Sequence, residues 1–470
     1  MTHSRIVFSG LSGGAGKTIV SLGISRAWCR QGKLLRPFKK GPDYIDAMWL
    51  SLAANAPTSN LDPFLLSQEQ VCALFNERAA GYDISVIEGN RGLFDGKDVT
   101  GSCSTAELAR QLDAPVVLIL DCTKMTRTVA AVVAGCASFE KDLNLAGVIL
   151  NQTATDRHRA ILRDAIEQYT DVPVLGMLPR MKKNPIPERH MGLVSDQEYF
   201  SEGAGNSTED KALNYLADFM EDNVDLARVY SIACDVKPVS NPPISLWPEP
   251  VTDKPVTIGY VHDAALWFYY SENLDALKSA GAELVQLSLL DDEPWPELDG
   301  LYLGGGFPET LARELADNTA VLKRVRELAE SGLPIYAECG GFLYLTESIE
   351  YGGRTYPMAG VFPVQTKFKT RPQGLGYTCA EVVMDTPFYK AGTELHGHEF
   401  HYTYCEKSED ADLCFTVELS RGKGVSKGKD GLVYKNTFAG YNHIHALGAP
   451  EWAPAVISAA LKFRDTKERK

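Results

Sequence analysis

The chain has 470 residues, a formal net charge of −14, and 44% hydrophobic and 23% charged residues. This length exceeds one ordinary core, so we expect two or three globular domains. The acidic balance disfavours nucleic acid and anionic membrane surfaces as partners, since both favour basic proteins. Ten cysteines without a Cys-x-x-Cys pair predict a reducing, cytoplasmic location without a disulfide framework. We also expect no signal peptide and no transmembrane helix, which would need about 20 consecutive apolar residues.

A glycine-rich segment, Gly10-Leu11-Ser12-Gly13-Gly14-Ala15-Gly16-Lys17-Thr18, follows a predicted strand at 5–9 and precedes a predicted helix at 19–28. Strand, glycine-rich turn and helix together are typical of a phosphate-binding loop. Backbone N–H groups and the helix N-terminus would bind the phosphates of ATP. The glycines concerned are Gly13, Gly14 and Gly16. Lys17 would reach the terminal phosphates and the Thr18 hydroxyl would bind Mg²⁺. The loop is longer than the strict pattern, with Leu11 at the first glycine position.

Apolar runs typical of buried strands recur in both halves of the chain. They lie at 5–9, 83–89, 115–121, 145–151 and 172–178, and again at 256–261, 283–287, 300–303 and 333–337. Because helical stretches separate them, they predict two doubly wound α/β domains with mostly parallel sheets. A proline-rich, aperiodic segment lies between the two series. We therefore predict a P-loop ATP-binding domain at 1–235, a linker at 236–255 and a second domain at 256–470.

Charged residues cluster near the predicted phosphate loop. The segment Lys39-Lys40-Gly41-Pro42-Asp43-Tyr44-Ile45-Asp46 combines cations and carboxylates, and Glu88 ends an apolar strand. Phosphoryl transfer needs lysines that neutralise phosphate charge and carboxylates that hold Mg²⁺. We therefore predict that Lys39 and Lys40 bind ATP, and that Asp43 and Glu88 bind the metal together with Thr18. The remaining candidates are Asn151 at a strand end for the nucleotide, and Tyr44, Asp46 and Asp95 for the substrate.

The second domain contains a candidate nucleophile. Cys339 follows the apolar strand at 335–338 and precedes Gly340-Gly341 and a helical stretch. This is the layout of a nucleophile elbow, in which small neighbours permit a strained turn. The N-terminus of the following helix would favour a thiolate.

Acyl transfer also needs a base and an oxyanion hole. His443 and His445 lie about 100 residues downstream of the cysteine, and either is a candidate base. Backbone N–H groups of Gly305, Gly306 and Gly340 are candidates for the oxyanion hole. Histidines also occur at 396, 398 and 401. His396 and His398 would share one face of a strand, but no Cys or acid cluster completes a metal site, so we favour structural or substrate-contacting roles.

Taken in order, these motifs resemble the cobyrinic acid a,c-diamide synthase family over nearly the whole chain. In that family a dethiobiotin-synthetase-like ATP domain is fused to a class I glutamine amidotransferase domain with a flavodoxin-like fold. The motifs are the phosphate loop, the 39–46 segment, Glu88-Gly89, Gly92-Leu93-Phe94-Asp95-Gly96, Gly304-Gly305-Gly306-Phe307-Pro308-Glu309, Glu338-Cys339-Gly340-Gly341, Gly397-His398-Glu399-Phe400-His401-Tyr402 and Tyr441-Asn442-His443-Ile444-His445.

Two positions differ from amidotransferases at large. Ala337 stands where many have glycine, and His445 occupies the position of the acid that commonly follows the histidine. The sequence thus leaves open what orients the base and whether it is His443 or His445. Alignment with the usual amidotransferase histidine favours His443.

The resemblance implies that glutamine hydrolysis at Cys339 supplies ammonia to a corrinoid carboxylate activated as an acyl phosphate by MgATP. Ni-sirohydrochlorin or hydrogenobyrinic acid are alternative substrates, and the carboxylates amidated by cobyric acid synthase are less favoured. A P-loop ATPase switch protein is a further alternative, but that class does not need the cysteine domain. The assembly state, with a homodimer among the options, is left open.

Overall fold

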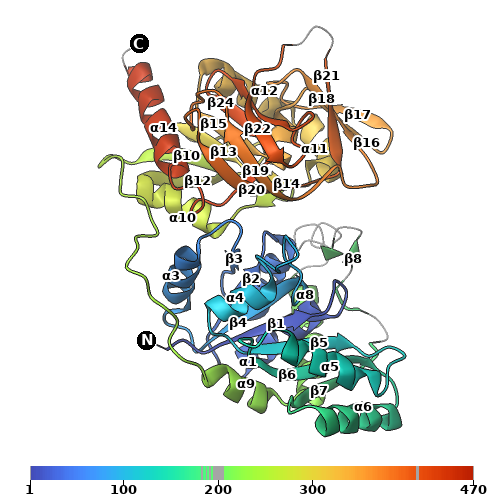
Figure 1. Ribbon diagram of the computed structural model, residues 1–470. Coiled ribbons are helices and arrows are strands. Elements are labelled where there is room, and N and C mark those ends of the chain that lie inside the picture. Colours follow the sequence, from blue (N-terminus) through green and yellow to red (C-terminus); the bar gives the residue numbers. More distant parts are fainter. Residues whose placement is uncertain are drawn as a thin grey trace. The chain divides into compact units, whose positions relative to one another are not determined.

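The computed structural model describes residues 2–181, 184–186, 188–189, 192–193, 206–408 and 412–468. By internal contacts the chain divides into two compact units, Met1–Ile244 and Ser245–Lys470. Each unit has its own sheets (Figure 1) and its own hydrophobic core. Among the described residues, no helix has both the length and the apolar character needed to cross a bilayer.

The N-terminal unit contains a seven-stranded parallel sheet with strand order β3-β2-β4-β1-β5-β6-β7. Its strands are β1 (Arg5–Gly10), β2 (Leu35–Lys40), β3 (Ser59–Leu61), β4 (Ile84–Gly92), β5 (Val116–Asp121), β6 (Leu145–Thr153) and β7 (Val174–Pro179). A separate short antiparallel pair is formed by β8 (Glu188–Arg189) and β9 (Gly192–Leu193). Because all strands of the large sheet are parallel, their carboxyl ends meet at one edge, where such sheets bind ligands.

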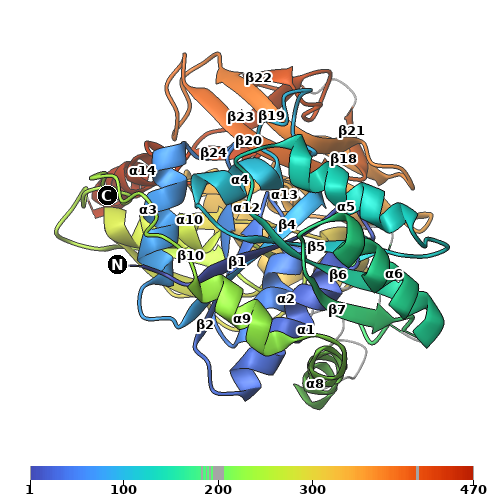
Figure 2. The same cartoon turned by 60° about the horizontal axis from the view of Figure 1, so that its bottom comes forward.

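Helices cover both faces of this sheet. They are α1 (Lys17–Arg30), α2 (Ile45–Ala54), α3 (Gln68–Ala79), α4 (Thr105–Gln111), α5 (Thr128–Phe139), α6 (Asp156–Tyr169), α8 (Asn206–Asn223) and α9 (Leu226–Cys234). Helix α1 packs against α2 and α8, whereas α3 packs against α4 and α5 against α6. Right-handed crossovers place these two sets on opposite faces (Figure 2). The core under α1 includes Phe8, Ile24 and Trp28.

The C-terminal unit contains a ten-stranded mixed sheet with order β12-β10-β13-β15-β24-β23-β22-β19-β20-β25. Pairing is parallel from β12 to β24 and antiparallel from there to β25. These strands are β10 (Val256–Val261), β12 (Ala282–Leu287), β13 (Gly300–Leu303), β15 (Ile335–Glu338), β19 (Gly374–Val382), β20 (Glu394–His401), β22 (Phe415–Arg421), β23 (Lys429–Tyr434), β24 (Thr437–Gly440) and β25 (His443–Ile444). The α/β class predicted for both units is confirmed. The antiparallel half of the second sheet is an addition that apolar runs alone do not reveal.

Shorter strands complete the C-terminal unit. They are β11 (Leu266–Phe268) paired with β14 (Gly305–Gly306), and β16 (Ser348–Tyr351), β17 (Arg354–Pro357), β18 (Val364–Phe368) and β21 (Thr403–Lys407) in a four-stranded sheet.

Its helices are η1 (Pro308–Leu311, a 3₁₀ turn), α10 (Ser271–Ala280), α11 (Ala312–Asp317), α12 (Thr319–Ser331), α13 (Gly340–Leu345) and α14 (Trp452–Glu468). One hydrophobic core includes α12 and α13, and a second includes α10 and α14. The strand β15 contributes to both cores, so its carboxyl end is held rigidly.

Candidate active sites

The glycine-rich loop between β1 and α1 has the conformation that its sequence predicts. Gly14 and Gly16 have φ angles of 77° and 99°, a region that favours glycine, and α1 begins directly after Gly16. The Lys17 ammonium donates a hydrogen bond to the Ser12 carbonyl over 2.9 Å, so the side chain folds back over the loop. Burial, followed by the nearby Lys39 ammonium, lowers the pKa of Lys17. A lysine held this way is poised to bind an anion.

Lys39 lies at the centre of a buried ionic cluster at the ends of β2 and β4. Its ammonium lies 2.5 Å from Asp46 Oδ2, 2.8 Å from Glu88 Oε1 and 3.9 Å from Asp43 Oδ2. Parallel pairing of Lys39 with Glu88 brings these residues together. Burial opposes ionisation of Asp46, but Lys39 outweighs it and lowers the pKa of that carboxyl. Burial, together with Asp46, raises the pKa of Asp43 to about 7.

The two adjacent lysines have different electrostatic surroundings. Successive residues of a strand point to opposite faces, and the surroundings of Lys40 accordingly differ from those of Lys39. Burial lowers the pKa of Lys40, opposed by the charges of Asp62 and Cys103. The printed ion pairs join Lys39 to Asp46 and Glu88, and the role of Lys40 toward ATP stays a prediction. Tyr44 immediately precedes α2 and is half-buried.

Asn151 and Asp95 both brace the phosphate loop region. The Asn151 amide donates to the Ala15 carbonyl over 3.0 Å, and a Cβ added to Gly16 would lie 2.3 Å from the same amide nitrogen. Asp95 accepts a hydrogen bond from the Gly92 N–H, and its charge opposes the lowering of the Lys17 pKa. Both predicted residues thus lie beside the loop, and their roles toward ligands remain predictions.

The chemistry of this cluster fits Mg²⁺ that arrives with phosphate. Thr18 Oγ1 lies 2.7 Å from Glu88 Oε1, and Glu88 Oε2 is buried without a hydrogen-bond partner in the described structure. Hydroxyl and carboxylate oxygens are the ligands that Mg²⁺ prefers. Among the described residues, however, no group of three or more His, Cys, Asp or Glu forms a metal cage. Protein sites for Mg²⁺ often supply only one or two carboxylates, and phosphates complete the shell.

Cys339 occupies a sharp turn between β15 and α13. Its φ angle is 45° and its ψ angle −98°, a strained conformation for a residue with a side chain. The thiol is 4% exposed and donates weakly to the Phe400 carbonyl over 3.9 Å. Strand, strained residue and helix are arranged as in a nucleophile elbow.

The surroundings of Cys339 oppose ionisation of its thiol. Burial raises the pKa of Cys339, and the charges of Glu309 and Glu338 raise it further. The Gly340 N–H, at the start of α13, lowers that pKa in the direction expected of a helix N-terminus, but burial and the two carboxylates outweigh it. A base must therefore remove the thiol proton as the sulfur attacks.

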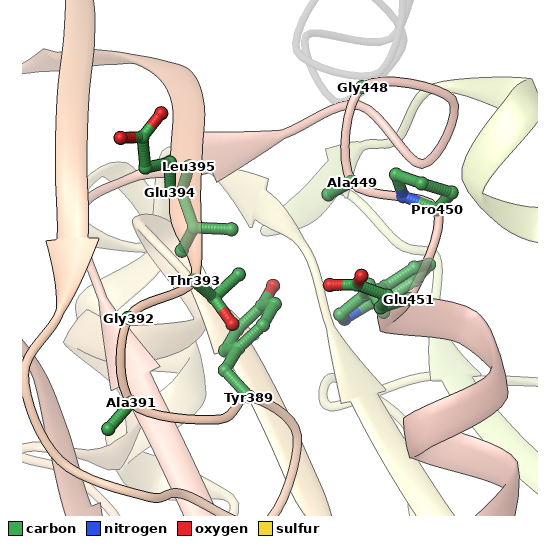
Figure 3. Close-up of a pocket in the computed structure, with 11 residues that line it drawn as sticks. Tyr389, Ala391, Gly392, Thr393, Glu394, Leu395, Gly448, Ala449, Pro450 and Glu451 are labelled. Atoms are coloured by element: carbon green, nitrogen blue, oxygen red, sulfur yellow. The ribbon is translucent and has the colours of Figure 1, made fainter.

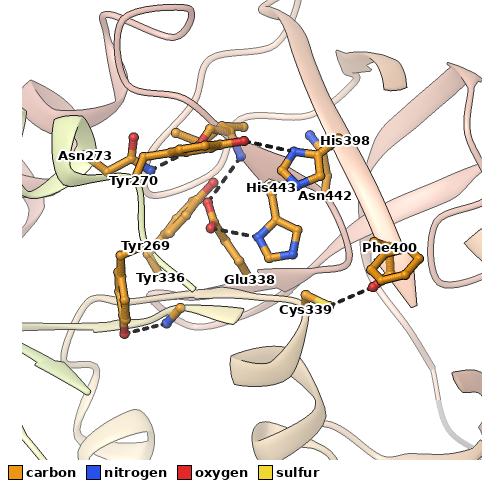
Figure 4. A network of polar contacts seen from close by, with 12 residues as sticks. Tyr269, Tyr270, Asn273, Tyr336, Glu338, Cys339, His398, Phe400, Asn442 and His443 are labelled. Carbon is orange, nitrogen blue, oxygen red and sulfur yellow. Dashed lines mark hydrogen bonds and ion pairs between the residues drawn. The ribbon is translucent and has the colours of Figure 1, made fainter. Parts of the chain in front are cut away.

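His443 is the histidine next to the nucleophile. Its Nδ1 lies 3.2 Å from Glu338 Oε2, and Figure 4 shows the imidazole between that carboxylate and Cys339. His445 lies elsewhere, with its Nε2 3.7 Å from Glu272 Oε2. The Leu447 N–H donates to His445 Nδ1 over 3.2 Å. One ring nitrogen of His445 thus faces a backbone N–H, and the other lies near a carboxylate.

The predicted oxyanion glycines lie close to the elbow. A Cβ on Gly340 would lie 2.8 Å from the Gly306 nitrogen, and a Cβ on Gly305 would lie 2.5 Å from His443 Cε1. Gly306 has a φ angle of 155°. Only glycines permit this close approach of three backbone segments, and the resulting pair of amides at Gly306 and Gly340 suits an oxyanion.

The remaining histidines have separate environments. His396 is exposed and His398 is buried, although both lie on β20. Antiparallel pairing places His398 directly opposite His443, and their rings stack with centroids 4.8 Å apart. His401 stacks on Tyr441. No metal cluster joins them within the described residues.

Sequence reasoning did not predict a role for Glu338 beside the histidine. The signal available in the sequence was an acid at the end of an apolar strand.

A separate pocket of about 440 Å³ in the C-terminal unit lies between 389–395 and 448–452 (Figure 3). Its lining includes the carboxylates of Glu394 and Glu451 and the Tyr389 side chain. None of its lining residues is a cysteine, a histidine or a cation. The acyl-transfer groups therefore lie outside this pocket.

These features define the class of the protein as a glutamine amidotransferase unit joined to a P-loop nucleotide-binding unit. Residues 257–451 match the CobB/CobQ-like glutamine amidotransferase domain, and residues 4–184 match an AAA domain.

Full-length relatives identify the family. A cobyrinate a,c-diamide synthase of Magnetococcus marinus is 42% identical over 96% of both chains. Those of Listeria innocua and Archaeoglobus fulgidus are 40% and 37% identical, over 94% and 98% of this chain and 96% and 98% of theirs. The chain belongs to the cobyrinate a,c-diamide synthase family, which consists of glutamine-hydrolysing ligases.

Proposed function

We propose that this protein amidates the a- and c-side-chain carboxylates of cobyrinate, using ATP and glutamine. The observation that carries the proposal is the presence of two complete chemistries in one chain. A phosphate loop lies beside a Lys39–carboxylate cluster, and a strained cysteine lies beside a histidine and two glycine amides. Neither a switch ATPase nor a simple glutaminase needs both. The substrate is inferred from the names of the relatives, which are cobyrinate a,c-diamide synthases.

In the glutaminase half-reaction, Cys339 attacks the side-chain amide of glutamine. The S–H bond breaks as its proton passes to His443, and the new oxyanion is bound by the amides of Gly306 and Gly340, with Gly305 beside them. Collapse forms a thioester, and the same proton leaves with ammonia. Water then releases glutamate. We assign the base to His443 rather than His445, because His445 Nδ1 accepts a backbone N–H and its Nε2 lies near Glu272.

In the synthetase half-reaction, a substrate carboxylate attacks the γ-phosphate of ATP. A carboxylate is a poor electrophile, and the acyl phosphate supplies a good leaving group. Lys17 and Lys39 balance the phosphate charge, and Thr18, Asp43 and Glu88 would hold Mg²⁺. When bound, that ion would neutralise charge that develops on the phosphates. Ammonia then displaces phosphate, and the reaction repeats at the second carboxylate.

The partners in this proposal are glutamine and a corrinoid, and we place the reaction in the cytoplasm. The decisive experiment incubates the full chain with ATP, Mg²⁺ and glutamine and with cobyrinate, hydrogenobyrinate or Ni-sirohydrochlorin in separate reactions. Mass spectrometry should show a mass loss corresponding to two –OH to –NH₂ exchanges on cobyrinate. Efficient diamidation of another macrocycle, with cobyrinate unchanged, would reassign the substrate. Light scattering of the same sample would test whether it forms a homodimer.

A further inference from the structure

We propose that Glu338 is the positioning residue that orients His443 during glutamine hydrolysis, a role that rests on the proposed function of Cys339 and His443. Glu338 immediately precedes the nucleophile in sequence. It is therefore not in the position of the acid that commonly follows the amidotransferase histidine, where this chain has His445.

The Glu338 carboxylate is held by donors from two other strands. His443 Nδ1 lies 3.2 Å from Oε2, the Tyr302 hydroxyl donates to Oε2 over 3.3 Å, and the Ile444 N–H donates to Oε1 over 3.4 Å. Glu338 and His443 are each 1% exposed. Donors of this kind fix the carboxylate in place. If Nδ1 carries the hydrogen that faces this carboxylate, Nε2 is the ring nitrogen that can accept the thiol proton (Figure 4).

The fold explains how Glu338 and Cys339, which are adjacent in sequence, lie on either side of the His443 imidazole. Glu338 pairs in parallel with Gly440, three residues before His443, so the β15–β24 register brings carboxylate and histidine together. The strained turn at Cys339 then redirects the chain. As a result, the side chains of residues 338 and 339 lie on two sides of the His443 ring in Figure 4, although successive side chains of an uninterrupted strand would point apart.

The position of Glu338 affects how His443 takes up the proton of the Cys339 thiol. When the S–H bond of Cys339 breaks, His443 Nε2 gains the proton and the ring becomes an imidazolium. The Nδ1–H remains bound to Glu338, whose negative charge stabilises that imidazolium in a water-poor site. The Nε2 proton then passes to the leaving nitrogen of glutamine. Glu338 itself exchanges no proton at any step.

Glu272 supplies a matched control within the same unit. It is fully buried, and its Oε2 lies 3.7 Å from His445 Nε2. It thus repeats the pairing of a buried carboxylate with a histidine, at a site without a nucleophile. Glu272→Gln removes the same charge as Glu338→Gln.

The test measures the glutaminase kcat and KM of the full-length wild type, Glu338→Gln and Glu272→Gln. We expect Glu338→Gln to lower kcat by about 100-fold, within the range for acid–base groups, with little change in KM. Glu338→Asp should recover part of kcat. Glu272→Gln should match the wild type, and all variants should retain amidation driven by added ammonia.

A wild-type kcat in Glu338→Gln would overturn the positioning role. So would an equal loss in Glu272→Gln, because any buried carboxylate would then have the same effect. If Cys339→Ser abolishes glutaminase in the same assay, the proposed function stands in either case; full activity in Cys339→Ser overturns both proposals. A measurement on unaltered protein, ¹⁵N NMR of labelled histidines, should find the Nδ1–H tautomer at His443. The Nε2–H tautomer would contradict the proposal even if Glu338→Gln did not fold.

Discussion

The Thr18 hydroxyl donates a hydrogen bond to Glu88 Oε1 over 2.7 Å, although 70 residues separate them. The same carboxylate oxygen lies 2.8 Å from the Lys39 ammonium. Parallel pairing of β4 with both β1 and β2 makes this convergence possible. The relationship joins the phosphate loop to the ionic cluster, so variants at either place should impair the same half-reaction.

Replacing Asp43 should impair ATP-dependent amidation alone. The Asp43 carboxylate accepts the Asp46 N–H and faces Lys39 at 3.9 Å. We expect Asp43→Ala to lower the synthetase rate by about 100-fold, the scale for one preorganised electrostatic group, while glutaminase is unchanged. A coupled phosphate-release assay measures this. Asp83→Asn is the control, because Asp83 lies directly before the start of β4 and its carboxylate accepts only the Leu34 N–H in the described contacts. An unaltered synthetase rate in Asp43→Ala would refute the role.

Cys339→Ser should separate the two half-reactions. A serine hydroxyl is a weaker nucleophile than a thiol, and no hydrolysis of glutamine should be detectable. Amidation with added ammonium chloride should continue at the wild-type rate, because the phosphate loop is unchanged. Glutamate release and product mass are the two measurements. Loss of both activities would count against separate sites.

Replacing each candidate base by asparagine should have different effects on glutaminase kcat. His443→Asn should lower glutaminase kcat by about 10²- to 10⁴-fold, the usual contribution of a positioned acid–base group. His445→Asn should change kcat far less, since that ring interacts with the Leu447 N–H and lies near Glu272. Steady-state glutamate release compares them. The opposite ranking would move the base to His445.

Gly305→Ala tests the close packing around the base. The new methyl would lie 2.5 Å from His443 Cε1 and 3.1 Å from Phe268 Cβ, so the imidazole must shift. We expect glutaminase kcat to fall by about 100-fold, because a small misplacement of a reacting group can cost this much in rate. Ammonia-driven amidation should stay intact. Gly135→Ala, within α5, is the control, because a Cβ there meets nothing within 4 Å and the residue has no positive φ angle. Normal glutaminase in Gly305→Ala would show that the ring tolerates displacement.

Asp430 predicts a pH dependence of stability. Burial raises the pKa of Asp430 to about 6, despite hydrogen bonds from the Tyr441 and Asn442 N–H groups. A raised pKa means that the folded state favours the protonated acid, so its stability contribution is full below pH 3.8 and is lost as pH rises through about 6. The difference in unfolding free energy between wild type and Asp430→Asn should change by up to ~3 kcal/mol between pH 4 and 7.5.

Urea denaturation at both pH values measures this change. The asparagine variant should gain relative stability at the higher pH, because it carries no charge to bury. A constant difference between the two proteins would show that Asp430 has the same pKa in the folded and unfolded states.

Much of both candidate sites could be predicted from local sequence. The phosphate loop depends on glycines that permit positive φ angles, and the elbow depends on small residues after Cys339. Such conformational requirements act within a few residues. The P-loop and α/β architecture, the candidate nucleophile and the family were therefore predictable before any long-range contact was known.

The surroundings of individual motif residues depend on the tertiary structure and could not be predicted from the motifs alone. Lys39 and Lys40 read as one dibasic motif, yet alternation along β2 gives them different surroundings. The predicted thiolate at Cys339 depended on the helix N-terminus, whereas burial and the nearby Glu309 and Glu338 dominate the site.

The partner of the catalytic histidine required the tertiary structure. Glu338 and His443 are 105 residues apart, and an acid that ends an apolar strand looks the same in sequence whether it faces solvent or an imidazole. Only the β15–β24 register and the turn at Cys339 aim this carboxylate at His443. Local sequence thus determined which chemical groups the chain possesses. Long-range strand pairing decided which of them meet, because side-chain direction depends on the register of strands that sequence proximity does not encode.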